Sequence, residues 1–310
     1  MSIMGTNEFF LKKTARRRAI RDSAGDRLFV SVLTVISFII LVLVLYPLIF
    51  VLSSSFSSGD AVMFGKVTFL PVEFSVEGYR MVLNEAALIR GFRNSLLYTS
   101  LGTTINIVMT TLLAFPLSRR RMPGSNVIMF LVVFTMFFSG GLIPTFLIVS
   151  RMGMIDTVWA MVIPNAISTF NLIIMRTYFQ NSIPEELYES ASLDGCGYFR
   201  YLIKIVLPLS KPILAVLVLY YAVGHWNSYF NALIYLRSSR LISLQLALRS
   251  ILLANQITSS AGGEGFGEVA KIGLTVKYAV IVISSIPVII LYPFIQKYFI
   301  KGVMIGALKG

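Results

Sequence analysis

Few side chains in this chain could perform chemistry. Its 310 residues include one histidine, one cysteine, and 14 aspartates and glutamates. A zinc site built on two histidines, such as His-Glu-x-x-His, cannot form within the chain, and one cysteine cannot close an intrachain disulfide. No Gly-x-Ser-x-Gly elbow occurs, and no glycine-rich phosphate loop ending in Lys-Ser or Lys-Thr. We therefore expect no catalytic residue, no metal ligand and no cofactor in this chain, which would not be an enzyme.

The acidic residues are informative because of where they are missing. All 14 lie outside the centres of the long apolar stretches, and Asp156, which is close to one, lies at its edge. Carriers driven by protons or sodium usually bury carboxylates in mid-membrane, because the cation needs an anionic site there. What remains is a passive channel, or a transporter that takes its energy from another subunit.

Four of the acids cluster in one polar segment between apolar stretches. Ser182 precedes Glu185 by three residues, which is the spacing of a capping box at a helix start, and Gly195 would stop the helix. The pattern predicts a short helix over 183–193. A second short helix, over 198–206, would lead through a Leu-Pro pair into the next apolar stretch.

The same segment carries a recognisable motif. It reads Glu189-Ser190-Ala191, three residues, Gly195, nine residues, then Ile-Val-Leu-Pro ending at Pro208. This resembles the signature loop of permeases of binding-protein-dependent ABC importers, written Glu-Ala-Ala, three residues, Gly, nine residues, Ile-x-Leu-Pro. The spacing matches throughout, and Ser190 in place of the first Ala is the one departure. The flanks look like the carbohydrate-uptake (maltose-type) branch, and the tail over 296–306 is similar to its complex-oligosaccharide members.

The resemblance implies that the short helix docks on a separate ATPase subunit, which would hold ATP and Mg. Glu189 would offer a polar anchor, Ala191 would let the partner approach closely, and Gly195 would supply the turn. An ordinary amphipathic surface helix is the alternative. The candidate coupling residues are Glu186, Glu189, Ser190, Ala191, Asp194 and Gly195.

The resemblance also implies a fold and an assembly. The fold would be that of a type I ABC importer permease, all-α and embedded in the bacterial cytoplasmic (inner) membrane. The expected partners are a second related permease, two ATPase subunits, an extracellular or periplasmic sugar-binding protein and membrane lipid.

Composition agrees with a chain that crosses a membrane many times. Hydrophobic residues make up 56% of the chain and charged residues 13%, about half the charge of a soluble domain, and the mean hydropathy is +0.80. A helix of about 20 apolar residues spans the hydrocarbon core. We expect six such helices: Leu28–Leu52, Ser95–Leu117, Asn126–Ser150, Met154–Met175, Pro212–Leu236 and Val276–Phe299. The Gly140-Gly141 pair before Pro144 predicts a kink in the third.

The basic residues predict the orientation. With alternate connections assigned to opposite sides, Lys and Arg number 17 on one side and 9 on the other, leaving out Lys277 at a span edge. The richer side is cytoplasmic, so both termini face inward. The net charge of +13 lies beside apolar spans and suits anionic lipid rather than nucleic acid. The predicted parts are a basic cytoplasmic N-tail (1–27), a transmembrane permease domain (28–299) with a cytoplasmic coupling loop (176–211) and outward loops (53–94 and 237–275), and a cytoplasmic C-tail (300–310).

Polar residues in the fifth apolar stretch suggest a path for the solute. On a helical wheel they share an arc of about 120° and occupy the outer half of the span. Amide and phenol groups offer the hydrogen bonds and flat apolar faces that suit a sugar. Packing of helices through small and polar residues is the alternative. The candidate pathway residues are Tyr220, Tyr221, Gly224, Asn227, Ser228, Asn231 and Tyr235. Asn106, Asn165 and Asn171, from other spans, are weaker pathway candidates, for which helix–helix packing is the favoured interpretation.

Three functions remain open at this point. The first is the transmembrane subunit of an ATP-driven importer of oligosaccharides derived from polysaccharides. The second is a passive channel or facilitator for small polar solutes, and the third is a membrane enzyme. Uptake that stops when ATP is withheld separates the first from the second. The outward loops carry a surplus of only two basic residues, which does not argue for an acidic sugar.

Overall fold

The computed structural model describes residues 23–119, 121–260 and 266–307. Most of the predicted N-tail, the centre of the glycine-rich stretch over 259–267 and the end of the C-tail lie outside these residues. The chain divides into two compact units, residues 1–49 and 50–310, and each is described by itself. The described residues form helices joined by turns and loops, and their β-structure is limited to one isolated bridge between Ser57 and Phe74.

The first unit contains most of helix α1 (Ala24–Ser55), which includes the predicted first span. A reciprocal pair of hydrogen bonds starts this helix: the Ser23 backbone N–H donates to the Asp26 carboxylate at 3.0 Å, and the Asp26 N–H donates to the Ser23 hydroxyl at 3.1 Å. The side chains from Leu28 to Leu45 are exposed, as expected for a helix that faces hydrocarbon.

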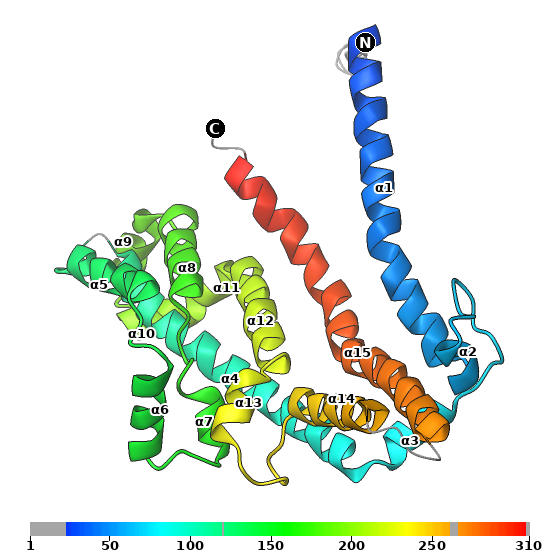
Figure 1. Ribbon diagram of the computed structural model, residues 1–310. Helices are drawn as coiled ribbons and strands as arrows, with labels where there is room; N and C mark the ends of the chain where they lie inside the picture. The colour runs from blue at the N-terminus through cyan, green and yellow to red at the C-terminus, as the bar shows by residue number, and fades with distance from the viewer. Residues whose placement is uncertain (1–22, 120, 261–265, 308–310) are drawn as a thin grey trace, which may run out of the picture. The chain divides into compact units, whose positions relative to one another are not determined.

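The second unit is built around α4 (Ala86–Ser118), a helix of 33 residues that contains the predicted second span. Helices α8 (Thr169–Ser182) and α12 (Lys211–Trp226) lie along it, and α14 (Leu244–Ser260) packs near its N-terminal end (Figure 1). Polar side chains such as Asn106 and Thr110 are fully buried on α4. Half of this helix therefore faces protein rather than lipid.

The third and fourth apolar stretches are each divided into two helices. The third forms α5 (Ser125–Phe137) and α6 (Leu142–Arg151), which meet at 112°. The predicted kink at Gly140-Gly141 is confirmed, and Gly141 has the positive φ of 84° that this turn needs. The fourth forms α7 (Val158–Val162) and α8 with a non-helical break over 163–168, so the prediction of one continuous helix there was wrong.

The coupling segment is helical in short pieces. It comprises α9 (Glu185–Leu193), α10 (Tyr198–Tyr201), a π-helical turn (Leu202–Val206) and α11 (Leu207–Leu209). The second short helix predicted here therefore extends further than expected. The pieces from Tyr198 to Leu209 meet α12 at 84°.

The remaining helices close the second unit. α13 (Phe230–Tyr235) follows α12, and α15 (Phe266–Ala307) contains the predicted sixth span. The short helices α2 (Gly59–Met63) and α3 (Glu77–Asn84) pack on α15. Lys271 pairs with Asp60 at 2.5 Å, and a Cβ on Gly78 would meet the Thr275 backbone at 2.7 Å, so α3 can approach α15 only through a glycine.

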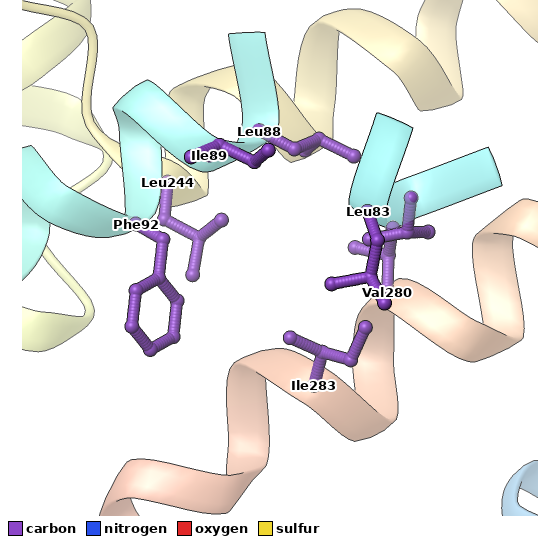
Figure 2. A pocket seen from close by; sticks show the side chains of 8 residues that line it. Leu83, Leu88, Ile89, Phe92, Leu244, Val280 and Ile283 are labelled. Atoms are coloured by element: carbon purple, nitrogen blue, oxygen red, sulfur yellow. The ribbon is translucent and has the colours of Figure 1, made fainter. Parts of the chain in front are cut away.

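Two apolar clusters stabilise this unit, one at each end of α4. One joins α4, α8, α9, α10 and α12, and the other joins α3, α4, α14 and α15. The second also surrounds an apolar cavity of about 350 Å³, lined by leucines, isoleucines, valines and Phe92 (Figure 2).

By length and apolarity, α1, α4 and the Gly273–Pro293 part of α15 could each span a membrane. The count rises to five if each bent helix pair is one span. The chain thus has the all-α character that was predicted.

Candidate functional site

The coupling helix α9 begins differently from the prediction. Its N-cap is Pro184, and no side chain makes a capping hydrogen bond there. The predicted capping box is wrong because Ser182 is already the last residue of α8, only two residues before Pro184. Glu185 and Glu186 still occupy the first turn of α9, where the helix dipole favours negative charge.

The end of α9 follows the prediction closely. Gly195 has a φ of +72°, in the left-handed region where a side chain is disfavoured. The turn is closed by hydrogen bonds from the Gly195 N–H to the Ser192 carbonyl at 3.0 Å and from the Cys196 N–H to the Ala191 carbonyl at 2.9 Å. Asp194 is the C-cap residue. The glycine therefore reverses the chain and returns it towards α10.

One face of α9 is packed on the rest of the chain. Ala191 is only 7% exposed and belongs to the cluster shared by α4, α8, α10 and α12. The ring of Tyr188 stacks on that of Tyr198, with centroids 4.9 Å apart, and meets Tyr201 edge to face at 5.2 Å. The small side chain of Ala191 thus allows α9 to approach the chain's own core, a contact that the sequence did not predict, and its expected part in the approach of a partner stays a prediction.

The opposite face of α9 is exposed. Glu186, Ser190 and Asp194 lie on the surface, and Ser190 donates to the Glu186 carbonyl one turn earlier at 2.9 Å. Glu189 forms an ion pair with Arg121 at 2.7 Å, although both side chains are more than half exposed. An exposed pair of this kind contributes roughly 0.2–1 kcal/mol, so it orients Glu189 more than it stabilises the fold.

The C-terminal end of α4 meets the coupling segment through arginines. Arg176 on α8 donates from Nε to the Leu117 carbonyl at 2.9 Å, satisfying one carbonyl that the end of α4 leaves free. Arg119, the C-cap of α4, is turned inward and lies over the rings of Phe115 and Tyr201. Sequence reasoning counted these arginines only as an orientation signal.

The predicted pathway residues do not form a single arc. α12 ends at Trp226 and α13 starts at Phe230, so the wheel that placed Asn231 and Tyr235 beside Tyr220 is interrupted. The exposed members are Tyr220, Gly224 and Asn227, the half-buried ones are Ser228 and Asn231, and the buried ones are Tyr221 and Tyr235.

Tyr221 points into the chain and joins three elements. Its hydroxyl lies 2.7 Å from the Thr110 hydroxyl on α4 and accepts a 3.1 Å hydrogen bond from the Ser168 backbone N–H. Ser168 is the N-cap of α8 and ends the break over 163–168. The tyrosine thus satisfies a backbone group that the broken fourth span leaves free, as a hydrocarbon environment demands.

A buried side chain elsewhere on α4 also satisfies backbone groups of the break over 163–168. Asn106 donates from Nδ2 to the carbonyls of Asn165 at 2.6 Å and Ala166 at 2.9 Å, and its Oδ1 lies 2.6 Å from Nε2 of His225. A Cβ on Gly102, one turn earlier on α4, would collide with the His225 ring. We call Asn106, Thr110, Tyr221 and His225 the polar hub. A polar residue inside each apolar stretch was the only sequence signal for it.

Tyr235 lies at the outer end of the same region. Its carbonyl accepts a 2.8 Å hydrogen bond from the Asp156 N–H, and its ring stacks on Phe146. The Asp156 carboxylate accepts hydrogen bonds from the backbone N–H groups of Arg237 and Ser238, both at 2.9 Å. These bonds, Ser238 first, lower the pKa of Asp156 below its usual value.

The described residues contain no group of three or more His, Cys, Asp or Glu side chains that could hold a metal ion. The site as described offers two features. One is an acidic, exposed face on helix α9, whose other face is packed on the chain. The other is a set of polar groups on α12 and around the break between α12 and α13.

Comparison with known proteins adds a further observation. Residues 86–305 match the sequence model of a family described as the inner membrane component of binding-protein-dependent transport systems. The polygalacturonan/rhamnogalacturonan transport system permease protein YtcP of Bacillus subtilis (strain 168) is 42% identical over 271 residues, which cover 85% of this chain and 92% of that protein.

Two solved structures of bacterial transporters are also similar to this chain. A chain of a bacterial ABC transporter involved in the import of the acidic polysaccharide alginate superposes with a TM-score of 0.81 at 36% identity, covering 90% of this chain and 99% of that one. A chain from an alginate ABC transporter in complex with an alginate pentasaccharide-bound periplasmic protein has a TM-score of 0.59 at 16% identity, over 87% of this chain and 93% of that one. The second likeness concerns the fold alone.

Proposed function

Because this chain belongs to the family of inner membrane components of binding-protein-dependent transport systems, we propose that it is the transmembrane subunit of an ATP-driven importer of oligosaccharides. The family match confirms the resemblance predicted from the Glu189–Pro208 segment. It also confirms the predicted place in the bacterial inner membrane and the prediction of a transport permease rather than an enzyme.

The observation that carries the proposal is the construction of α9. Ala191 fixes one side of the helix to the chain's core, while Glu186, Glu189 and Asp194 are presented on the exposed side. A helix held in this way moves with the body of the permease when a partner displaces it. A separate ATPase pair, binding ATP and Mg, would engage this acidic face. ATP binding would draw two coupling helices together and turn the pathway outward, and hydrolysis would reset it.

The finer topology belongs to the same proposal. Six spans result if the two bent pairs and the α7–α8 pair each cross the membrane once, together with α1, α4 and α15. The distribution of Lys and Arg then puts both termini and α9 on the cytoplasmic side. One chain would supply half of a pathway, so a second related permease completes it.

The substrate class rests on the relatives. YtcP is named for polygalacturonan and rhamnogalacturonan, and the solved relative imports alginate. Both names support oligosaccharides derived from polysaccharides, delivered by a sugar-binding protein outside. Within this chain the side chains that we assign to the pathway lie on α12 and around the α12–α13 break: Tyr220 and Asn227, which are exposed, and Asn231, which is half-buried.

Reconstitution with the partner permease, the ATPase and the binding protein tests the coupling. We expect Glu189→Lys and Gly195→Pro to leave the protein in the membrane and to abolish ATP-dependent uptake of a labelled oligosaccharide. Glu77→Lys, the same charge change at an exposed position on α3, is the matched control. Undiminished uptake by Glu189→Lys would contradict the assignment.

Arg121→Gln shows which contact of Glu189 matters. This variant removes the ion pair with Arg121 within the chain but leaves the carboxylate available to a partner. Retained uptake in Arg121→Gln beside lost uptake in Glu189→Lys supports docking of the ATPase on Glu189. Equal loss in both variants assigns Glu189 to positioning α9 instead.

The pathway has a separate test. Asn227→Leu and Asn231→Leu should reduce uptake while the basal ATPase activity of the complex persists. Loss of both activities together would point to folding and remove these residues from the pathway.

A further inference from the structure

We propose that the cavity between the C-terminal end of α4 and the α9–α10 segment binds an anionic phospholipid, with the lipid phosphate on the Arg119 guanidinium. The site is independent of which solute the protein moves. It rests on the side chain of Arg119, on the make-up of the cavity wall and on the place of both along the chain.

Arg119 is unusual for an arginine next to a membrane span. It is only 9% exposed, and its guanidinium carbon lies 4.8 Å from the ring centroid of Phe115 and 5.2 Å from that of Tyr201. Its Nε and Nη2 atoms are buried, and within the described part of the chain they make no hydrogen bond. A guanidinium cannot shed its proton, so two buried donors without an acceptor are costly. Two aromatic faces offset the charge but accept neither hydrogen bond in the plane of the group.

The cavity that Arg119 lines has two kinds of wall. Its volume is about 480 Å³, and it lies between the end of α4 and α9–α10. Leu112 and Phe199, two residues of its wall, are 47% and 68% exposed, so the cavity adjoins an exposed apolar surface. The apolar wall is formed by Leu112, Phe115, Pro116, Met122, Pro123, Phe199 and Leu202, and the polar part by Arg119, Arg121, Glu185, Tyr188 and Tyr198. An acyl chain and a charged headgroup fit these two walls.

The charges around the cavity leave Arg119 available. Arg121 is already paired with Glu189 at 2.7 Å. The Glu185 carboxylate also lines the cavity, and it makes no ion pair with Arg119 within 4 Å. A phosphate diester can accept two hydrogen bonds from one edge of a guanidinium, which is the bidentate geometry that arginine provides. A second, more polar cavity of about 400 Å³, lined by Gln180 and Asn181 among others, also has Arg119 in its wall.

The position in the chain favours lipid over a free phosphate ion. The Arg119–Arg121 run directly follows a helix long and apolar enough to cross the membrane, so the guanidinium lies at the level of the headgroups. Basic pockets between spans on the cytoplasmic side are known to bind anionic headgroups. A free phosphate would gain nothing from the apolar wall.

Native mass spectrometry of the full chain tests the proposal. The protein is purified and exchanged into mixed micelles with equal amounts of phosphatidylglycerol and phosphatidylcholine. Leu112→Trp enlarges a side chain of the cavity wall seven residues before Arg119, and Met109→Trp, also exposed on α4, places the same side chain at a position that does not line the cavity. Arg119→Gln removes the charge. A parallel series adds inorganic phosphate in place of phosphatidylglycerol.

We expect the wild-type chain to retain phosphatidylglycerol over phosphatidylcholine by about fivefold, the preference that one arginine near an anionic headgroup confers. Leu112→Trp should lose this preference and Met109→Trp should keep it. If Arg119→Gln fails to fold, the comparison of Leu112→Trp with Met109→Trp still tests the proposal. Equal preference in wild type and Leu112→Trp would overturn the proposal. So would inorganic phosphate binding that Leu112→Trp leaves unchanged, because the ligand would then be the free ion.

Discussion

At the predicted coupling helix α9 and at the polar hub, hydrogen bonds to the backbone are made in two different ways. Both must satisfy backbone groups where a helix is interrupted. At the end of α9 the chain does so locally, because Gly195 and Cys196 donate to carbonyls three and five residues earlier. At the break over 163–168, Asn106 donates to a carbonyl 59 residues away in sequence, and Tyr221 accepts from a backbone N–H 53 residues away.

The environment explains the difference. Around α9 water can meet any group that the chain leaves free, so a single glycine is enough. Within a span no water is available, and each interrupted turn needs a donor or acceptor from another helix. The comparison therefore predicts that substitutions in the hub cost much more than substitutions at the end of α9.

The largest effect is expected from Asn106→Leu. The change leaves the carbonyls of Asn165 and Ala166 and the His225 ring without their partner, and each buried orphan costs about 1–3 kcal/mol. We expect a loss of at least about 3 kcal/mol of stability, seen as a lower yield of monodisperse protein and a lower thermal unfolding temperature in detergent. Asn181→Leu, exposed at the end of α8, is the control. Equal stability of the two variants would refute the role of the hub.

A pair of glycines on facing helices sharpens the comparison. A methyl group on Gly102 would collide with the His225 ring, which Asn106 holds in place, whereas one on Gly224 meets nothing within 4 Å. Gly102→Ala should therefore lower stability by about 1–3 kcal/mol through overpacking. Gly224→Ala should be neutral, or raise stability by up to about 1 kcal/mol through helix propensity. Thermal unfolding of the two variants gives opposite signs if the hub is as rigid as its hydrogen bonds indicate.

The end of α9 could be predicted from the sequence, but the polar hub could not. The reason is that α9 is closed by hydrogen bonds between nearby residues, whereas the hub depends on residues far apart in the sequence. The end of α9 at Gly195, the kink at Gly140-Gly141 and the first span could be predicted because each depends on residues a few positions apart. The hub could not, because nothing in the sequence pairs Asn106 with residue 165 or Thr110 with Tyr221.

The predicted pathway arc shows the error that arises when a break in a helix is not visible in the sequence. A helical wheel assumes an unbroken helix, and the break at Asn227–Tyr229 falls where Asn and Ser follow Trp226 without a glycine or proline to mark it. Asn231 and Tyr235 were therefore placed on the same arc as Tyr220, although they lie on a separate helix. Tyr221 lies within α12, and its hydroxyl is a buried acceptor for the α8 N-cap, a contact that the sequence does not predict. The role of Ala191 was missed because a small residue serves an internal contact and an external one equally well.

At the coupling helix the expected effects are smaller. Gly195→Ala forces a side chain into the left-handed region, at a cost of about 1–2 kcal/mol. Gly197→Ala, two residues on, has open space and an ordinary φ of −72°, and should be neutral. The measurement is ATPase stimulation in the assembled complex together with the unfolding temperature. A larger stability loss in Gly195→Ala than in Gly102→Ala would reverse the ranking.

The smallest effect concerns Asp156, which combines features of both regions. Its carboxylate reaches across 81 and 82 residues to the N–H groups of Arg237 and Ser238, as the hub does, but it lies in a solvent-accessible loop, as α9 does. Because these bonds lower its pKa, the folded state is stabilised above the unfolded pKa of about 3.9, and this contribution is lost as the pH falls through the lower folded value. Asp156→Asn should therefore unfold at a slightly lower temperature than wild type at pH 7, with the difference closing below pH of about 4. Asp194→Asn, the same substitution at an exposed position at the end of α9, is the matched control. A loss for Asp156→Asn as large as that for Asn106→Leu would mean that sequence separation, rather than burial, decides the cost.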